Sequence, residues 1–259
     1  LSPRPAFFIF VPLLLPMKIL LTNDDGVFAE GLRVLREAFQ ELGDVYVVAP
    51  DRERTAISHA LTLDRPLRIR EVGERLWAVD GTPVDCIHLA LHCVLGERPS
   101  LVVSGVNNGP NMGEEVVYSG TVSAAFEATF LGLRAMAVSI AARRGHHYDT
   151  AARVALRVAK RVLEEGLPPR VFLNVNVPNL PEGKVRGFKI TRLGHRIFND
   201  CIVERVDPRG HKYYWIGGAD TGYEGGEGTD FAAVAEGYVS VTPLKACLLY
   251  TSPSPRDRG

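Results

Sequence analysis

Two adjacent carboxylates and a distant amide follow apolar segments of this sequence, where a sheet would present them together. Asp24 and Asp25 end the apolar stretch 18–23, and Asn107 comes shortly after the apolar stretch 101–104. Neighbouring carboxylates repel each other unless a proton or a cation lies between them. Oxygen ligands of this kind suit hard divalent ions such as Mg²⁺ or Mn²⁺ and do not suit Zn²⁺. These residues therefore predict a metal site that leaves positions open for a phosphate oxygen and a water.

The same residues also have a plainer interpretation. The run Asn-Asp-Asp-Gly at 23–26 is good turn chemistry, in which Asp24 caps a helix and Asp25 faces solvent. A second loop rich in amides and hydroxyls favours the metal site, but the residues alone leave both interpretations open.

A second candidate site begins at residues 118–121, Tyr-Ser-Gly-Thr, where a helix is expected to start. Free backbone N–H groups and the helix dipole attract anions at such a position, and Ser119 and Thr121 add hydroxyl donors. The alternative is an ordinary cap that binds nothing. The preceding glycine- and asparagine-rich loop is long for a simple connection, which favours a phosphate site.

The remaining motifs give one weak candidate for a zinc site and disfavour three common enzyme classes. His88 and His92 are spaced to share a zinc ion, with Cys86 and Cys93 beside them, but the segment is apolar and lacks the HExxH glutamate. Neither GxGxxG nor GxxxxGK[ST] is present, which disfavours a dinucleotide oxidoreductase and the usual ATP cradle. The GxSxG elbow of serine hydrolases is also missing.

Alternating strands and helices are expected to position these groups. Residues 18–23, a helix closed by Gly43, and residues 44–50 make one strand–helix–strand unit, and the pattern then recurs. Helices are expected at 83–95, 119–131 and around 151–162, and strands at 101–104, 135–140 and 171–177. Continuous apolar strands between amphipathic helices predict an α/β fold with a mostly parallel sheet covered on both faces. Ligands bind beyond the carboxyl ends of such strands.

The pattern changes after Pro178. Residues 188–191, 202–206 and 213–216 are expected to form antiparallel strands, and 217–228, with six glycines, a mobile loop. Thr229 is expected to cap a short helix that reaches Ala235, and 238–242 a final strand. The predicted organisation is an upstream extension at 1–16, a catalytic core at 17–180, a β-rich extension at 181–244 that returns to the core, and an atypical tail at 245–259.

Composition narrows the functional class. Among 259 residues, 46% are hydrophobic, and 30 Lys and Arg balance 30 Asp and Glu. This balance disfavours a disordered acidic protein and one that coats nucleic acid by charge, so no stable nucleic-acid partner is expected. The four cysteines form no CxxC pair, which favours a reducing cytosol and hence a cytoplasmic protein.

The first residues do not predict a membrane anchor. The apolar run 6–15 is shorter than the ~20 residues of a spanning helix, and Pro12 interrupts it. No small-residue cleavage site follows, so neither secretion nor a membrane partner is expected. We interpret Met17 as the start of the folded protein.

Eight ordered motifs between Met17 and about Leu244 carry a family resemblance. They lie at residues 19–26, 48–54, 81–86, 104–113, 119–122, 174–178, 213–215 and 236–243. Together they closely resemble the survival protein SurE family of metal-dependent nucleotidases. The resemblance implies a Rossmann-like three-layer core and a C-terminal β extension used in dimer or tetramer assembly. It also implies hydrolysis of nucleoside 5′- and 3′-monophosphates, and in some members of short polyphosphate, with Mg²⁺ or Mn²⁺.

The resemblance also assigns residues. It implies metal ligation by Asp24, Asp25 and Asn107, and by a hydroxyl at position 55. The family has serine at that position where this sequence has Thr55, whose extra methyl group is expected to crowd the site. The resemblance implies phosphate binding by Asn111 and by Ser119, Gly120 and Thr121. Residues 245–259 resemble nothing in the family.

The expected function is therefore that of a phosphomonoesterase with one divalent ion per subunit. Asp24 and Asp25 are expected to be catalytic as well as metal-ligating, with one of them taking the proton of the attacking water. Two alternatives remain open. The same loops could hold a nucleotide or phosphate as a sensor without turnover, or they could be purely structural turns.

Overall fold

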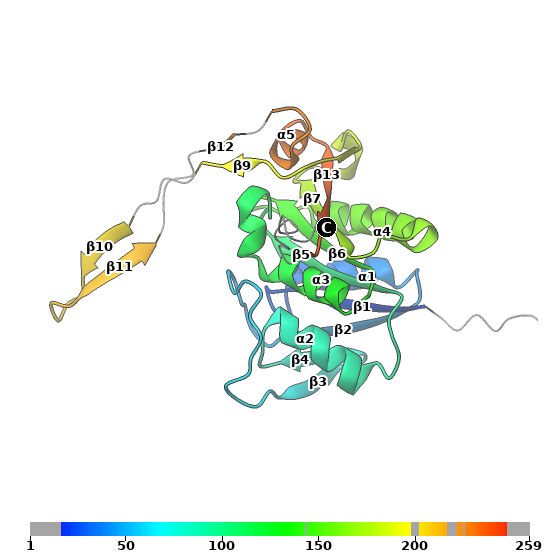
Figure 1. The fold of residues 1–259 in the computed structure, drawn as a ribbon, viewed down its shortest axis with the longest axis horizontal. Helices are drawn as coiled ribbons and strands as arrows, with labels where there is room; N and C mark the ends of the chain where they lie inside the picture. Colours follow the sequence, from blue (N-terminus) through cyan, green and yellow to red (C-terminus); the bar gives the residue numbers. More distant parts are fainter. Residues whose placement is uncertain (1–16, 143, 198–201, 217–221, 225, 248–259) are drawn as a thin grey trace, which may run out of the picture.

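The computed structural model describes residues 17–142, 144–197, 202–216, 222–224 and 226–247. A nine-stranded sheet forms the centre of the molecule, with helices on both faces (Figure 1). In spatial order its strands are β3 (Ile69–Gly73), β4 (Leu76–Val79), β2 (Asp44–Pro50), β1 (Lys18–Thr22), β5 (Leu101–Asn108), β6 (Ala135–Ala141), β7 (Val171–Pro178), β13 (Val239–Lys245) and β8 (Phe188–Ile190). The helices are α1 (Glu30–Phe39), α2 (Pro83–Leu89), which continues as a π-helical turn (Ala90–Val94), α3 (Gly120–Phe130), α4 (Tyr148–Glu165) and α5 (Asp230–Ala235), with 3₁₀ turns at Gly113–Val117 and Glu182–Lys184.

The sheet is buried because its two faces pack against different helix pairs. One core cluster joins α1 and α4 to the sheet, with Leu35 and Phe39 fully buried. The other joins α2 and α3 to the opposite face, around Ile87 and Phe172. Strands β4, β2, β1, β5, β6 and β7 run parallel to their neighbours in this part of the sheet. The α/β class and the two covered faces expected from the sequence are confirmed.

The strand order reverses between β1 and β5. From β1 the chain crosses to β2 on one side, and it later returns to place β5 on the other side. Connections leave β1 and β5 in opposite directions, so their carboxyl ends border a crevice at this switch point. Asp24 and Asp25 follow β1, and Asn107 lies near the end of β5. The fold therefore brings the predicted metal ligands to its natural ligand crevice.

Three features differ from the sequence expectations. Strand β8 runs parallel to β13 at the edge of the central sheet, so its assignment to an antiparallel extension was wrong. The antiparallel pair β3–β4 was not predicted, because β3 is mostly exposed and mixes charged with apolar residues, and β4 is only four residues long. Strand β5 extends to Asn108 instead of ending at Ser104, which makes Asn107 part of a strand.

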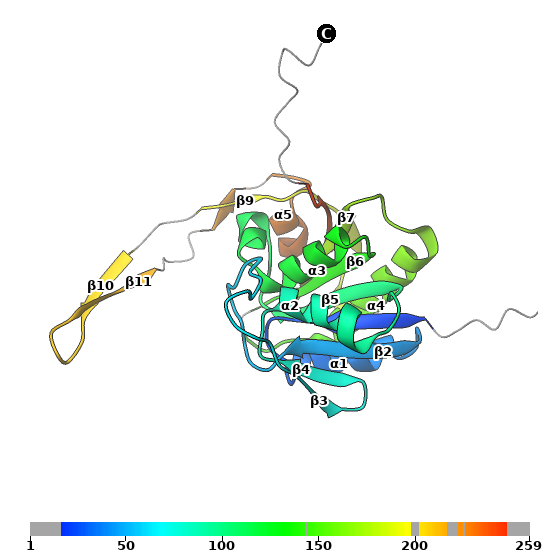
Figure 2. The same cartoon turned by 60° about the horizontal axis from the view of Figure 1, so that its bottom comes forward.

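A β-hairpin extends away from the sheet in both views (Figures 1 and 2). We call β10 (Ile202–Val206) and β11 (Lys212–Ile216) the arm. Its strands are antiparallel, as expected, and the short pair β9 (His195–Arg196) and β12 (Tyr223–Glu224) lies between the arm and the body. The arm's turn is closed by Asp207, whose carboxylate accepts the backbone N–H groups of Arg209 and His211.

The predictions for the chain ends fall largely outside the described residues. Residues 1–16, 248–259 and much of the glycine-rich stretch 217–228 are among those that the structure does not describe. Strand β13 continues to Lys245, and the buried Ala246 donates its N–H to the Arg170 carbonyl at 2.7 Å. The central sheet therefore includes Lys245. No helix in the described part of the chain is long and apolar enough to cross a membrane.

Candidate active site

A tight turn carries the two aspartates away from β1. The side chain of Asn23 accepts the N–H of Gly26 at 3.2 Å and donates to its carbonyl at 3.0 Å. Gly26 has a φ of +106°, and a Cβ there would lie 3.2 Å from the Arg52 carbonyl carbon. The turn chemistry noted in the sequence is thus present, and it sets the direction of Asp24 and Asp25 without satisfying their carboxylates.

Asp24 lies at the N-terminus of α3. One carboxylate oxygen accepts the Thr121 hydroxyl, and the other accepts the Thr121 N–H at 3.2 Å. A Cβ on Gly120 would come within 2.9 Å of the Asp24 Cβ, so only glycine lets the helix approach this closely. Asp24 therefore does accept a helix-terminal N–H, as the plainer interpretation proposed, but from a helix 97 residues away.

Asp25 and Asn107 lie beside Asp24. The Asn108 N–H donates to Asp25 Oδ2 at 3.1 Å, and the Thr121 hydroxyl lies 3.4 Å from Asn107 Oδ1. A shift in register between Ser104 and Asn107 interrupts the pairing of β5 with β6, a type of irregularity that redirects side chains beside active sites. The structure thus brings Asp24, Asp25 and Asn107 together, as the sequence predicted.

Burial and neighbouring negative charge disfavour the ionised form of both carboxylates. Burial raises the pKa of Asp24, and Glu53 adds a smaller repulsive contribution. Burial and the charge of Asp24 together raise the pKa of Asp25 to about 6. None of the ion pairs among the described residues involves Asp24 or Asp25. A bound cation would relieve this repulsion.

Asn111 is fixed by buried polar side chains from two neighbouring strands. Its N–H donates to Asn176 Oδ1 at 2.9 Å, and its carbonyl accepts from Asn174 and Asn176 at 2.8 and 3.0 Å. Its own amide donates to Ser139 Oγ at 2.8 Å. Asn111 is therefore held in one position at the edge of the site.

Of the other predicted phosphate donors, Ser119 and Thr121 already make contacts within the protein. Ser119 accepts the Val122 N–H as the N-cap of this helix, and both donors of Thr121 are directed at Asp24. The Ser119 hydroxyl hydrogen and the N–H of Gly120, at the first helical position, remain for an anion because neither has an acceptor within the helix. The contribution of Thr121 is thus to hold Asp24.

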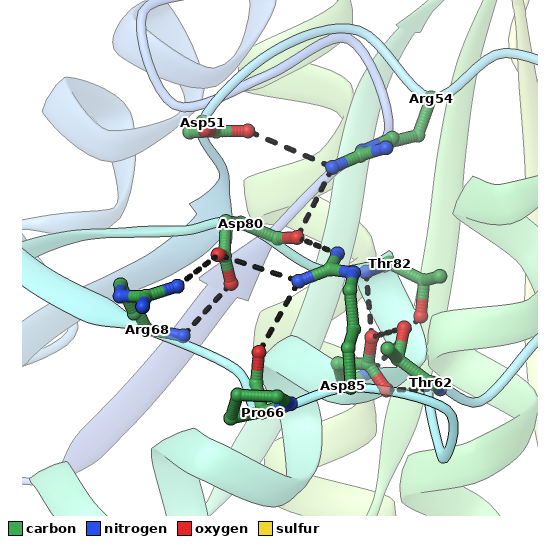
Figure 3. A network of polar contacts seen from close by, with 9 residues as sticks. Asp51, Arg54, Thr62, Pro66, Arg68, Asp80, Thr82 and Asp85 are labelled. Atoms are coloured by element: carbon green, nitrogen blue, oxygen red, sulfur yellow. Dashed lines mark hydrogen bonds and ion pairs between the residues drawn. The ribbon is translucent and has the colours of Figure 1, made fainter.

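Thr55 lies on a loop, residues 51–68, that the structure anchors at several points. Arg54 donates its N–H to the Asp24 carbonyl at 2.7 Å and its guanidinium to the Asp80 carbonyl at 3.2 Å (Figure 3). Further along, Thr62 donates its N–H and hydroxyl to the buried Asp85 at 2.9 and 2.6 Å. The exposed Thr55 hydroxyl donates to Glu53.

These groups border one pocket of about 350 Å³. Its lining includes every predicted metal and phosphate residue except Gly120 and Thr121, which lie just behind Asp24. The lining residues are Asp24, Asp25, Glu53, Thr55, Ala56, Asn107, Asn108, Gly109, Pro110, Asn111, Glu115, Tyr118 and Ser119. The pocket has room for a small phosphate ester beside the two carboxylates.

The donor set fits a hard divalent ion. Two carboxylates, an amide oxygen and a hydroxyl reach the same pocket, and none of these ligands is nitrogen or sulfur. Nowhere in the described ranges do three His, Cys, Asp or Glu side chains gather as a metal site. Of the disfavoured zinc candidates, His88 contacts Glu127 at 2.8 Å, and Cys86 is buried.

Sequence reasoning missed the residues that position the site from behind. Ser139, Asn174 and Asn176 are fully buried, yet they were not proposed as site residues. The available signal was two asparagines at alternate positions of an otherwise apolar strand. Such side chains point to the same face of a sheet and need hydrogen-bond partners when buried.

Comparisons with known proteins agree with this geometry. The family described as survival protein SurE matches residues 19–200. A curated protein named 5′-nucleotidase SurE from Geobacter metallireducens is 55% identical, covering 88% of this chain and 91% of the relative. One of the same name from Geotalea daltonii is 53% identical, covering 88% and 92%. The crystal structure of the SurE protein from Aquifex aeolicus is 44% identical, with a TM-score of 0.82, covering 90% and 94% of the two chains.

Proposed function

The chain belongs to the survival protein SurE family, and from this premise we propose that it is a 5′-nucleotidase that hydrolyses nucleoside monophosphates to nucleoside and phosphate. The observation that carries the assignment is the convergence of Asp24, Asp25 and Asn107 on one pocket at the switch point of the sheet. Activity toward 3′-monophosphates and short polyphosphate is a further part of the proposal, as is a cytoplasmic location.

Asp24, Asp25, Asn107 and Thr55 would hold one divalent ion, Mg²⁺ or Mn²⁺. When bound, such an ion neutralises phosphate charge and lowers the pKa of a water. Thr121 and Gly120 keep Asp24 in place, and the Asn108 N–H fixes one oxygen of Asp25. Thr55 would need to release Glu53 to contribute its hydroxyl.

Proton abstraction and phosphate binding are assigned to different residues of the pocket. Asp25 is the better general base, because both oxygens of Asp24 already accept Thr121 donors while Asp25 Oδ1 has no partner among the described residues. We assign the phosphate contacts to Ser119 and Asn111, which line the pocket, and to the N–H of Gly120 at the first position of α3, which would stabilise phosphate oxygens during in-line attack by water. The nucleoside would leave with the ester oxygen.

Metal removal tests this function directly. Treatment with a chelator is expected to lower the turnover of a nucleoside 5′-monophosphate at least about 100-fold, and Mg²⁺ or Mn²⁺ should restore it. Saturating metal should also raise the melting temperature, because a ligand that binds only the folded state stabilises it by mass action. Phosphate release and thermal unfolding are the two measurements.

The two alternatives give different results in the same assays. A sensor would show the thermal shift and would bind the nucleotide at one equivalent per chain, but it would release no phosphate. Purely structural turns would show neither effect. Turnover that is unaffected by complete metal removal would contradict the proposed mechanism.

We further propose that the protein self-associates as a dimer or tetramer through the arm. Two-stranded hairpins are marginally stable alone, and this one exposes apolar side chains on both strands. These side chains are Ile202, Val206, Tyr213, Tyr214, Trp215 and Ile216. A second copy of the chain would supply a matching apolar surface, since most soluble oligomers are symmetric.

Light scattering would test the assembly. The mass in solution is expected to be two or four times the 28.4 kDa of one chain. Trp215→Ser should reduce it because the indole is one of the large exposed apolar groups of the arm. Phe28→Ser is the control, since Phe28 is 74% exposed and lies outside the arm. A monomeric wild-type protein would contradict the assembly and leave the nucleotidase proposal unaffected.

A further inference from the structure

Tyr118 is the one aromatic side chain among the described residues that line the active-site pocket. The other lining residues are acidic, amide- or hydroxyl-bearing, or small. Tyr118 is 60% exposed, although it lies at the edge of a pocket beside buried carboxylates. An exposed aromatic ring at a pocket edge provides a flat apolar surface for a ligand.

The backbone holds Tyr118 in a fixed position. Its N–H donates to the Glu115 carbonyl at 3.0 Å, and its own carbonyl accepts the Ser58 N–H at 3.0 Å. The preceding 3₁₀ turn is tied to β9 through Glu114, which accepts the Arg196 N–H at 2.8 Å and contacts His195 at 2.7 Å. A ring attached to such a braced segment loses little freedom when a ligand binds.

Tyr118 is also directly next to the phosphate end of the site. It precedes Ser119, the N-cap of α3, and consecutive Cα atoms are about 3.8 Å apart. Tyr118 and Ser119 both line the pocket, so a ligand with its phosphate at the start of α3 would have an aromatic ring from the adjacent residue on the same pocket wall.

We propose that Tyr118 is the platform on which the nucleobase of the substrate stacks, an inference that rests on the proposed nucleotidase function. Stacking on an aromatic ring tolerates every base, because each base has a π-face. Tyr118 thus selects a nucleoside monophosphate over a base-free sugar phosphate without selecting among bases.

A second pocket provides the competing location for the base. It has a similar volume, about 350 Å³, and is lined by His59, Phe126 and Phe172 among others. It shares no lining residue with the active-site pocket, and none of the predicted metal ligands borders it. A base in this pocket would have no lining contact in common with a phosphate at Asp24 and Asp25. The geometry therefore favours Tyr118.

The test compares a substrate that has a base with one that lacks it. Adenosine 5′-monophosphate and ribose 5-phosphate are assayed with wild type, Tyr118→Ala, Tyr118→Phe and Val117→Ala in the presence of Mn²⁺. Tyr118→Ala is expected to raise the KM of the nucleotide about tenfold while the KM of ribose 5-phosphate changes less than about twofold. Tyr118→Phe should retain the nucleotide KM, since it keeps the ring. Val117→Ala is the matched control, because Val117 is the adjacent residue, is 62% exposed and borders the second pocket instead.

Other outcomes overturn the proposal. Equal increases in KM for both compounds would mean that Tyr118 positions the phosphate end. A base-specific increase in Phe126→Ala, but not in Tyr118→Ala, would place the base in the second pocket. Equilibrium binding of the same two compounds separates this proposal from the proposed function. Tighter binding of the nucleotide that depends on Tyr118, without turnover, would support the platform and contradict the nucleotidase. Equal binding of both compounds by the wild type would contradict the platform whether or not turnover occurs.

Discussion

Asp25→Asn is expected to lower kcat/KM for a nucleoside 5′-monophosphate by about 10²–10⁴-fold, the usual contribution of a positioned general base. Asparagine has the same shape, and its carbonyl oxygen can still accept the Asn108 N–H. The substitution removes the negative charge and the ability to take a proton, while the surrounding contacts are retained. Steady-state kinetics with saturating Mg²⁺ or Mn²⁺ measures the loss.

The stability of the same variant should not fall together with its activity. Burial and the charge of Asp24 both disfavour an ionised Asp25, so its neutralisation is expected to leave the metal-free protein at least as stable as wild type. Added Mg²⁺ or Mn²⁺ should raise the melting temperature of the wild type more than that of Asp25→Asn. Active sites commonly combine a gain in function with a cost in stability.

Asp64→Asn provides the matched control. Asp64 is an exposed carboxylate on the same loop as Thr55, outside the pocket lining, and it forms no ion pair with another described residue. Its kinetics and thermal shift should equal those of the wild type. Wild-type kcat/KM in Asp25→Asn would contradict both the general-base role and the proposed ligand set.

The sequence predicts which site residues meet, because these residues follow the ends of parallel strands. Buried apolar strands of a parallel sheet present their carboxyl ends at one edge, so residues after two such strands are expected to meet. Asp25 and Asn108 are 83 residues apart, yet they are joined by a hydrogen bond for this reason. Strand β2 was predicted with its observed bounds because a turn precedes it and Pro50 ends it.

The unpredictable part depends on contacts that no local pattern encodes. The sequence around Gly120 predicts only the start of a helix. The structure shows that the absence of a side chain at Gly120 makes room for Asp24. Strand β8 is three residues long, too short for its sequence to indicate parallel pairing with β13. The π-helical turn Ala90–Val94 lies inside the helix predicted at 83–95, and the apolar pattern does not distinguish it from α-helix. The family resemblance implied a set of metal ligands and a phosphate contact for Thr121, but it did not indicate the contact of Thr121 with Asp24 or that of Asn176 with Asn111.

Asn176→Ala is expected to lower the free energy of unfolding by about 3 kcal/mol, because each buried polar group left unsatisfied costs about 1–3 kcal/mol. Asn176 is fully buried and bonds both the N–H and the carbonyl of Asn111. The loss is a large part of the ~5–15 kcal/mol of a typical domain, but the variant should still fold. Denaturant unfolding with an unchanged slope would measure it.

The same substitution should also reduce catalysis, which distinguishes it from a purely structural change. Asn111 lies on the loop that follows Asn107, so its release is expected to shift phosphate and metal contacts and lower kcat/KM roughly tenfold or more. Asn179→Ala is the matched control. Asn179 also forms two side-chain bonds to backbone groups, at His147 and Gly145, but it is partly exposed and borders no part of the pocket. Its loss should cost less than about 1 kcal/mol and leave kcat/KM unchanged. Equal effects of the two substitutions would mean that Asn176 does not position the active site, whereas a larger effect of Asn176→Ala on both quantities assigns it that role.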